Sequence, residues 1–237
     1  MSVVWHDLEC GRYDADLPLW RQLAAAADGP ILDVGAGTGR VTLPLARAGA
    51  QLTALDSDAV LLAELERRAA GLTVRTVCAD ARDFALSERF ALIIVPMQTV
   101  QLLGGAAGRL AFLRCAAAHL RPGGSVAIAI AEELEPFEVG PGVRGPLPDI
   151  CERDGVLYSS LPTAVRLEGD AVWLERDRET VSPDGTLLRD SDRIRLDLVS
   201  AGTLEREGGD AGLAVRPRIE IAPTAEHVGS RVVMLSG

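Results

Sequence analysis

The chain has 237 residues, with 24 basic and 34 acidic side chains and a formal net charge of −10. That length suits one α/β domain with a sizeable core and a small appended piece. The negative balance argues against nucleic acid as a partner, because phosphate contacts need clustered positive charge. Every basic residue is arginine, so a Schiff-base lysine and a phosphate-loop lysine are both excluded.

The cysteines and the first residues bear on compartment and targeting. Cys10, Cys78, Cys115 and Cys151 form no C-x-x-C pair, so we predict neither a zinc site nor a disulfide framework, and no other metal site. The residues around Trp5 do not form the basic and apolar regions of a signal peptide, and no stretch reaches about eighteen apolar residues. We expect reduced thiols in a soluble, cytoplasmic protein that has no membrane partner.

The first predicted element is an amphipathic helix over residues 14–27, where Leu17, Trp20 and Leu23 recur at helical spacing. A short apolar strand follows and ends in an acid. Residues 31–40 read Ile-Leu-Asp-Val-Gly-Ala-Gly-Thr-Gly-Arg, and a second amphipathic helix begins at once after them. This order predicts a strand, a tight turn and a helix.

Three alternating glycines, Gly35, Gly37 and Gly39, form that turn. They allow positive φ and let a ligand lie against the backbone, and the helix that follows presents unpaired N–H groups. The next strand, over residues 51–55, ends in Asp56, whose carboxylate can accept hydrogen bonds from both hydroxyls of a ribose. The pattern predicts a nucleoside-binding crevice at the carboxyl ends of parallel strands.

The glycine spacing indicates which nucleoside binds. Dinucleotide-binding folds usually space their glycines G-x-G-x-x-G, whereas here the order is Gly35-x-Gly37-x-Gly39 with Asp33 ahead of it. This order resembles motif I of the class I S-adenosylmethionine (SAM)-dependent methyltransferases. SAM carries no phosphate and is cationic at sulfur, so an acid beside the glycines favours it. A ligand-free strand-to-helix turn is the alternative.

The next elements follow the order of the same family. A third strand over residues 72–77 leads to Asp80, and in the family an acid at this position hydrogen-bonds the adenine amine. A fourth strand over residues 90–95 is almost entirely apolar, as expected in a parallel sheet buried on both faces. A helix over 106–120 then leads through Arg-Pro-Gly-Gly, which resembles the family's turn, into a fifth strand over 125–131.

The resemblance implies two sets of site residues. Tyr13 stands in a Tyr-Asp pair similar to one whose tyrosine lies near the methionine carboxylate, and packing at a helix start is its alternative role. The segment after the fourth strand normally contacts the substrate. The expected SAM-binding residues are Tyr13, Asp33, Gly35, Ala36, Gly37, Gly39, Asp56, Ser57, Asp80, Ala81 and Pro96, and the expected acceptor-binding residues are Met97, Gln98 and Val100.

After the fifth strand the composition changes. Residues 138–148 form a Pro/Gly-rich connection, and three segments, 163–167, 171–181 and 186–198, then follow a hairpin pattern. We expect a small antiparallel sheet that covers the substrate. The run Arg176-Asp177-Arg178-Glu179 is interpreted as a solvated face with cross-strand ion pairs, the alternative being an anion site. A helix over 201–211 and strands over 213–221 and 230–235 complete the chain.

The histidines offer few candidates for a general base. His119 precedes the Arg-Pro-Gly-Gly turn and is interpreted as structural, while His6 stands near the terminus and gives no signal. His227, in the turn before the last strand, is the one candidate base, and the catalytic residue is otherwise open. Methyl transfer is an in-line displacement, so positioning supplies much of its acceleration. The Asn/Asp-Pro-Pro-Tyr motif that amine- and base-modifying relatives often carry after the fourth strand is absent, which argues against methylation of nucleic-acid bases and leaves the acceptor atom open.

The sequence thus predicts an α/β fold with a doubly wound, seven-stranded, mostly parallel Rossmann-like sheet of order 3-2-1-4-5-7-6 and a small antiparallel lid. The expected division is a SAM-binding core over 1–136, a substrate-cover insertion over 137–198, and a helix and hairpin over 199–237 that complete the core sheet. The expected function is methyl transfer from SAM to O or N of a small molecule by a monomer or homodimer. A nicotinamide-dependent oxidoreductase and a non-catalytic SAM-binding partner protein are the alternatives.

Overall fold

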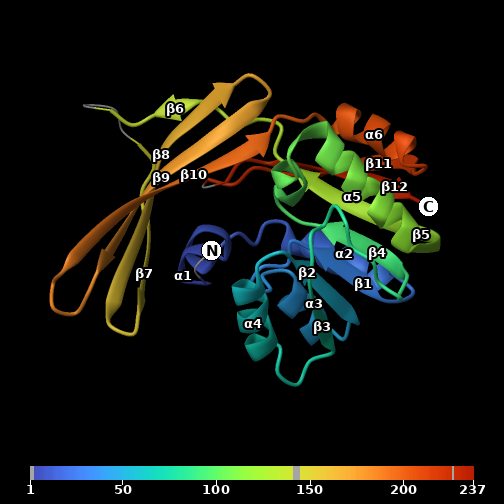
Figure 1. Ribbon diagram of the computed structural model, residues 1–237, viewed down its shortest axis with the longest axis horizontal. Helices are drawn as coiled ribbons and strands as arrows, with labels where there is room; N and C mark the ends of the chain where they lie inside the picture. Colours follow the sequence, from blue (N-terminus) through green and yellow to red (C-terminus); the bar gives the residue numbers. More distant parts are fainter. Residues whose placement is uncertain (1–2, 141–144, 226) are drawn as a thin grey trace.

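The computed structural model describes residues 3–140, 145–225 and 227–237, and it contains two sheets (Figure 1). The larger sheet has seven strands in the order β11-β12-β5-β4-β1-β2-β3, which confirms the predicted order 3-2-1-4-5-7-6. All neighbours are parallel except β12, which runs antiparallel to both β5 and β11. The strands are β1 (Ile31–Val34), β2 (Leu52–Asp56), β3 (Val74–Cys78), β4 (Phe90–Val95), β5 (Leu120–Ile130), β11 (Ala214–Ile221) and β12 (Ser230–Ser236).

Helices cover both faces of this sheet, because its central strands are apolar on both sides. Phe112 on α5 and Leu204 on α6 pack against one face, beside Ile93 of β4. Trp20 on α2 and Leu45 on α3 pack against the other. The doubly wound α/β architecture is therefore confirmed. The helices are α2 (Leu17–Ala26), α3 (Thr42–Arg47), α4 (Ala59–Arg68), the 3-10 turn η1 (Thr99–Leu102), α5 (Gly105–His119) and α6 (Ala201–Asp210).

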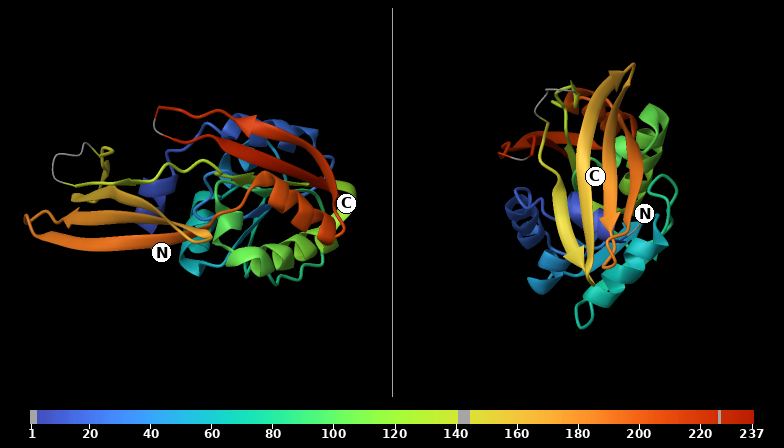
Figure 2. Two further views of the ribbon diagram at one scale, coloured as in Figure 1. Left: turned by 90° about the horizontal axis from the view of Figure 1, so that it is seen from above. Right: turned by 90° about the vertical axis from the view of Figure 1, so that its left-hand side faces the viewer.

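The second sheet is antiparallel and projects from one end of the molecule (Figure 2). Its order is β10-β9-β8-β6, and β7 pairs with β8. The sequence pattern missed the β7–β8 hairpin, whose turn uses positive φ at Asp154 and Gly155. Residues 141–144 of the predicted Pro/Gly-rich connection lie outside the described residues. The strands are β6 (Phe137–Glu138), β7 (Asp149–Arg153), β8 (Val156–Glu168), β9 (Ala171–Val181) and β10 (Leu187–Asp197).

A buried polar cluster anchors the end of β10 to the core. The Gln101 side-chain amide donates to the carbonyls of Asp197 and Ala131 at 3.0 and 3.2 Å. The carboxylate of Asp197 accepts hydrogen bonds from the Gly105 N–H and, at 2.9 Å, from the guanidinium of Arg109. Because these groups are buried and hydrogen-bonded, this junction between the two sheets is well defined.

A short helix that the sequence pattern did not predict, α1 (Val3–Cys10), lies between the core and the second sheet (Figure 1). Glu9 on α1 pairs with Arg176 and Arg178 of β9 at 2.7 and 2.8 Å. Arg178 is buried, so the expected solvated face is wrong for this residue. The cross-strand pairs are present, since Asp192 of β10 contacts Arg178 at 3.1 Å. Among the described residues, no helix is both long and apolar enough to cross a bilayer.

Candidate cofactor and acceptor site

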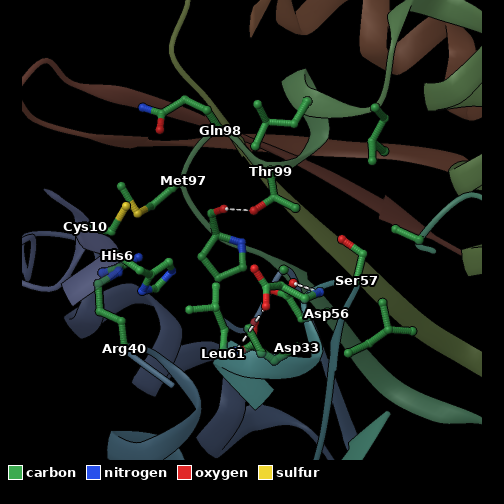
Figure 3. A pocket seen from close by; sticks show the side chains of 18 of the residues that line it. His6, Cys10, Asp33, Arg40, Asp56, Ser57, Leu61, Met97, Gln98 and Thr99 are labelled. Atoms are coloured by element: carbon green, nitrogen blue, oxygen red, sulfur yellow. Dashed lines mark hydrogen bonds between the residues drawn. The ribbon is translucent and has the colours of Figure 1, made fainter. Parts of the chain in front are cut away.

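A cavity of about 610 Å³ opens at the carboxyl ends of β1, β2 and β4 (Figure 3). The glycine turn forms one wall, and residues of α1, β9 and β10 form the opposite side. Most of the residues expected to bind SAM or the acceptor come together here. Those that line the cavity are Asp33, Gly35, Ala36, Asp56, Ser57, Asp80, Ala81, Pro96, Met97 and Gln98.

The three glycines of the turn all have positive φ, but they serve different purposes. A Cβ on Gly35 would overlap the side chain of Thr99, and one on Gly37 would overlap the imidazole of His6. A Cβ on Gly39 would overlap Leu65 of α4, so Gly39 allows helix packing. Gly37 and Gly39 do not line the cavity themselves, and the group that lies against Gly37 is His6.

Asp56 is held in place by backbone donors. Its Oδ2 accepts a hydrogen bond from the N–H of Gly37 at 2.8 Å, and its Oδ1 accepts one from the N–H of Asp58 at 2.9 Å. A carboxylate has about four acceptor positions, so each oxygen keeps capacity for another donor. Asp56 therefore fits the expected role of binding two hydroxyl groups.

Asp33 is the deepest acid of the cavity, with a relative exposure of 1%. Its Oδ2 accepts a hydrogen bond from Thr42 at 2.6 Å, whereas its Oδ1 has no partner among the described residues. Burial raises the pKa of Asp33 to about 6. A buried carboxylate oxygen without a partner fits a cationic group in the cavity, because such a group would satisfy it and favour its ionised form.

Asp80 already has a cationic partner. Its carboxylate pairs with the guanidinium of Arg82 at 2.6 Å, and the hydrogen bonds from Arg82 lower the pKa of Asp80 to about 2. The wall next to it is apolar and includes Ala81, Leu61 and Leu103. This part of the cavity therefore combines apolar side chains with an acid, which suits an aromatic ring that carries an amine.

A second cavity of about 270 Å³ adjoins the first, and the two share Met97, Gln98, Leu174 and Arg176. Met97 has φ +56°, a left-handed conformation that costs energy in a residue with a Cβ. Strain of this kind is common at functional sites. It places Met97 where the two cavities meet, in agreement with its expected contact with an acceptor.

Tyr13 and His227 lie together in this second cavity. Their ring centroids are 4.9 Å apart, and Tyr13 is buried at 7% relative exposure. Burial raises the pKa of the Tyr13 phenol. The guanidinium of Arg40 also lies over the Tyr13 ring, 5.2 Å from its centroid. Tyr13 thus lines the second cavity and does not line the larger one.

Val100 and His119 are buried and line neither cavity. Val100 lies in η1 and is fully buried in the core, so its expected contact with an acceptor is corrected to a packing role. His119 is also buried: its Nε2 accepts a hydrogen bond from the N–H of Leu86 at 2.9 Å, and its Nδ1 lies 2.7 Å from the carbonyl of Cys115. His119 is therefore structural, as predicted.

Helix α1 and strands β9 and β10 bring residues to the cavity that no sequence motif predicts, because these segments lie far apart in the chain. These unpredicted lining residues are His6, Glu9, Cys10, Leu174, Arg176, Ile194 and Leu196.

Within the described residues, no three His, Cys, Asp or Glu side chains are arranged to hold a metal ion.

Residues 31–124 match the model of a family described as a methyltransferase domain. The cypemycin N-terminal methyltransferase of a Streptomyces species is 31% identical over 131 residues, which are 55% of this chain and 54% of that protein. The chain spans about half the length of the curated relatives that it matches.

Solved structures extend the likeness over nearly the whole fold. The sugar N-methyltransferase KedS8 of Streptoalloteichus sp ATCC 53650 has a TM-score of 0.75 at 18% identity, over 97% of this chain and 91% of that one. The SAM-bound amino pentose methyltransferase CalS10 of Micromonospora echinaspora has a TM-score of 0.72 at 21% identity, over 98% and 96% of the two chains. At such identities these structures show that the fold is shared.

Proposed function

We propose that this chain, which carries a class I SAM-dependent methyltransferase domain, transfers a methyl group from SAM to an oxygen or nitrogen of a small molecule. One observation carries the proposal: two cavities, one next to the glycine turn and one under the second sheet, meet at Met97 and Gln98. A cofactor in the first and an acceptor in the second would face each other at that junction.

The residues of the larger cavity suit each part of SAM. The carboxylate of Asp56 would accept hydrogen bonding from the ribose, and the unpartnered oxygen of Asp33 would serve the cationic methionine end. Ala81 and Leu61 would pack against adenine, and Asp80, which pairs with Arg82, would accept from its amine. When bound, SAM supplies an electrophilic methyl group, and its neutral thioether product leaves without a proton.

The work of the protein in this proposal is mainly positioning. Holding the acceptor atom in line with the methyl group contributes up to about 7–11 kcal/mol in favourable cases. A general base adds roughly 10²–10⁴-fold only when the acceptor must lose a proton during transfer. An amine that arrives neutral needs no base, whereas a hydroxyl does, and His227 is the candidate base for that case.

The names of the similar proteins favour nitrogen acceptors. They include an N-terminal methyltransferase, a sugar N-methyltransferase and an amino pentose methyltransferase, against one O-methyltransferase of ubiquinone biosynthesis from Nitrobacter winogradskyi. We therefore rank a small amine ahead of a phenol or a carboxylate as the acceptor of this chain.

The organisation of the chain follows from the same proposal. Residues 1–136 and 199–237 form the SAM-binding core, and residues 137–198, which contain β6 to β10, cover the acceptor and determine specificity. The four cysteines are free thiols, which suits a reducing compartment, so we propose that the protein is cytoplasmic. We also propose that it is a monomer or homodimer and, because of its net charge of −10, that it does not bind nucleic acid.

The proposal is tested in two steps with the purified chain. Thermal unfolding is measured with SAM, S-adenosylhomocysteine or NAD, and only the adenosyl ligands are expected to raise the midpoint; a ligand at a hundredfold excess over its Kd adds about 2.7 kcal/mol. A panel of amines, phenols and carboxylates is then incubated with methyl-labelled SAM. Stabilisation by NAD alone contradicts the cofactor assignment, and absence of labelled product across all three classes contradicts the catalytic one.

A further inference from the structure

We propose that His6 is a cofactor-binding residue whose Nε2 accepts a hydrogen bond from a ribose hydroxyl of SAM, next to Asp56. The inference rests on the proposed function, because it assumes an adenosyl ligand in the larger cavity. His6 reaches this cavity from α1, an element that the sequence pattern did not reveal. Figure 3 shows its ring inside the cavity, on the side where Cys10 and Arg40 lie.

The position of the ring relative to Gly37 carries the assignment to the ribose. Gly37 donates its N–H to Asp56 at 2.8 Å, and a Cβ on the same glycine would overlap Nε2 of His6. His6 and Asp56 therefore flank one residue of the turn. A ribose presents two neighbouring hydroxyl groups, each with one hydrogen to donate. With His6 and Asp56 both next to Gly37, one hydroxyl donates to the carboxylate and the other to the imidazole nitrogen, in place of the expected donation of both to Asp56.

A chain of hydrogen bonds fixes which nitrogen of His6 carries the proton. The Thr38 hydroxyl donates its single hydrogen to Asp7 at 2.7 Å, so it can only accept from the Nδ1 of His6, 3.2 Å away. Asp7 is held in turn by the guanidinium of Arg68 on α4, one of whose contacts measures 3.0 Å. With its proton on Nδ1, the ring presents a lone pair on Nε2, which has no hydrogen-bond partner among the described residues.

The surroundings of the ring keep it neutral. Burial lowers the pKa of His6, and the cations Arg68 of α4 and Arg40 beyond the glycine turn act in the same direction. The acids Asp7 of α1 and Asp56 of β2 oppose them without reversing the shift. A neutral ring is the form that accepts a hydrogen bond and that adds no positive charge next to a cationic ligand.

Binding isotherms separate this role from general packing. Wild type and His6→Phe are compared with three probes: S-adenosylhomocysteine, adenosine and 2′,3′-dideoxyadenosine. Loss of one such hydrogen bond weakens binding about tenfold. We expect that loss for the two probes with ribose hydroxyls and unchanged binding of the dideoxy probe. Equal weakening of all three probes, or a loss confined to S-adenosylhomocysteine, would overturn the ribose assignment.

Nuclear magnetic resonance of the wild type tests the inference without any variant. The imidazole nitrogens of His6 are followed from about pH 5.5 to pH 8, where histidine charge normally changes. We expect a ring protonated at Nδ1 only, and a further fall of its pKa when S-adenosylhomocysteine saturates the site, because the bound hydroxyl favours the neutral ring. An unchanged His6 pKa on saturation overturns the inference. If the wild type binds no adenosyl ligand at all, the proposed function itself fails first.

Discussion

Glu9 on α1 accepts two hydrogen bonds from Arg178 on β9, each 2.8 Å long, and the carboxylate and the guanidinium are both buried. The same helix pairs with the core on its other side, where Asp7 contacts Arg68 of α4. Trp5 adds an edge-to-face contact with Tyr158 of β8, with centroids 5.4 Å apart. An eight-residue helix thus connects the second sheet to the wall of the larger cavity.

The buried pair leads to a prediction about stability. Glu9→Gln leaves the guanidiniums of Arg176 and Arg178 without their common anion, and removing one partner of a buried pair costs about 3–5 kcal/mol. We expect the free energy of unfolding in urea to fall by about 3 kcal/mol. The matched control is Glu179→Gln, which breaks the exposed pair with Arg189 and should cost under about 1 kcal/mol. Equal effects of the two variants would contradict this account of α1.

The raised pKa of Asp33 predicts that its contribution to the free energy of unfolding depends on pH. Its pKa lies near 3.8 when unfolded and about 6 when folded, so the folded protein holds this proton more tightly. Its contribution to stability is greatest below about pH 4 and is lost as the pH rises through about 6, a change of about 3 kcal/mol. Asp33→Asn removes that loss. The difference in unfolding free energy between variant and wild type should therefore grow from near zero at about pH 4 to about 3 kcal/mol at pH 7.

A binding measurement accompanies the stability curve of Asp33→Asn. The variant should bind SAM more weakly than the wild type at neutral pH, because the amide cannot compensate the positive charge of the ligand. It would then be more stable and less functional, as is common for substitutions in binding sites. A pH-independent difference in stability would show that burial does not destabilise the charged form of Asp33. Unchanged SAM affinity would show that Asp33 is not directed at the ligand.

The sequence predicted the core well and α1 not at all. The alternating glycines, the acid at Asp56 and the apolar run of β4 are local patterns with strict backbone or burial requirements, so they locate the strand ends directly. Helix α1 has eight residues, of which Leu8 alone is buried, so its amphipathic signal is weak. Its docking depends on the pair between Glu9 and Arg178 of β9, which are 169 residues apart in the chain. No local sequence pattern indicates such a contact.

The same limit explains which parts of the site were missed. Residues after β1, β2, β3 and β4 reach the cavity by topology alone, and the family resemblance named most of them. His6 and Arg176 come from elements packed over the cavity, so their place follows from tertiary contacts. Val100 was misplaced for a related reason: in the 3-10 turn η1, Thr99 and Leu102 are three residues apart and line the cavity, whereas Val100 is buried in the core.

The left-handed conformation of Met97 predicts a separation between stability and acceptor binding. Met97→Gly relieves a backbone strain of about 1–2 kcal/mol, whereas Met97→Val increases it, because a β-branched side chain is least compatible with positive φ. We expect the glycine variant to unfold at the same temperature as the wild type or higher, and the valine variant to unfold lower. Both should raise KM for the acceptor while the Kd for SAM changes little. A parallel loss of SAM affinity would place Met97 in the cofactor site instead.

His227 packs against Tyr13 in the second cavity. If the acceptor is an amine that arrives neutral, no base is needed, and His227→Ala should lower kcat less than about tenfold, well below the 10²–10⁴-fold expected for loss of a general base. The pH profile of kcat should keep its shape. His119→Ala is the comparison: it leaves the Leu86 N–H without its acceptor, so it should cost about 1–3 kcal/mol of stability while the folded enzyme keeps its kcat. A thousandfold loss of kcat in His227→Ala, with SAM binding intact, would instead identify an oxygen acceptor deprotonated by His227.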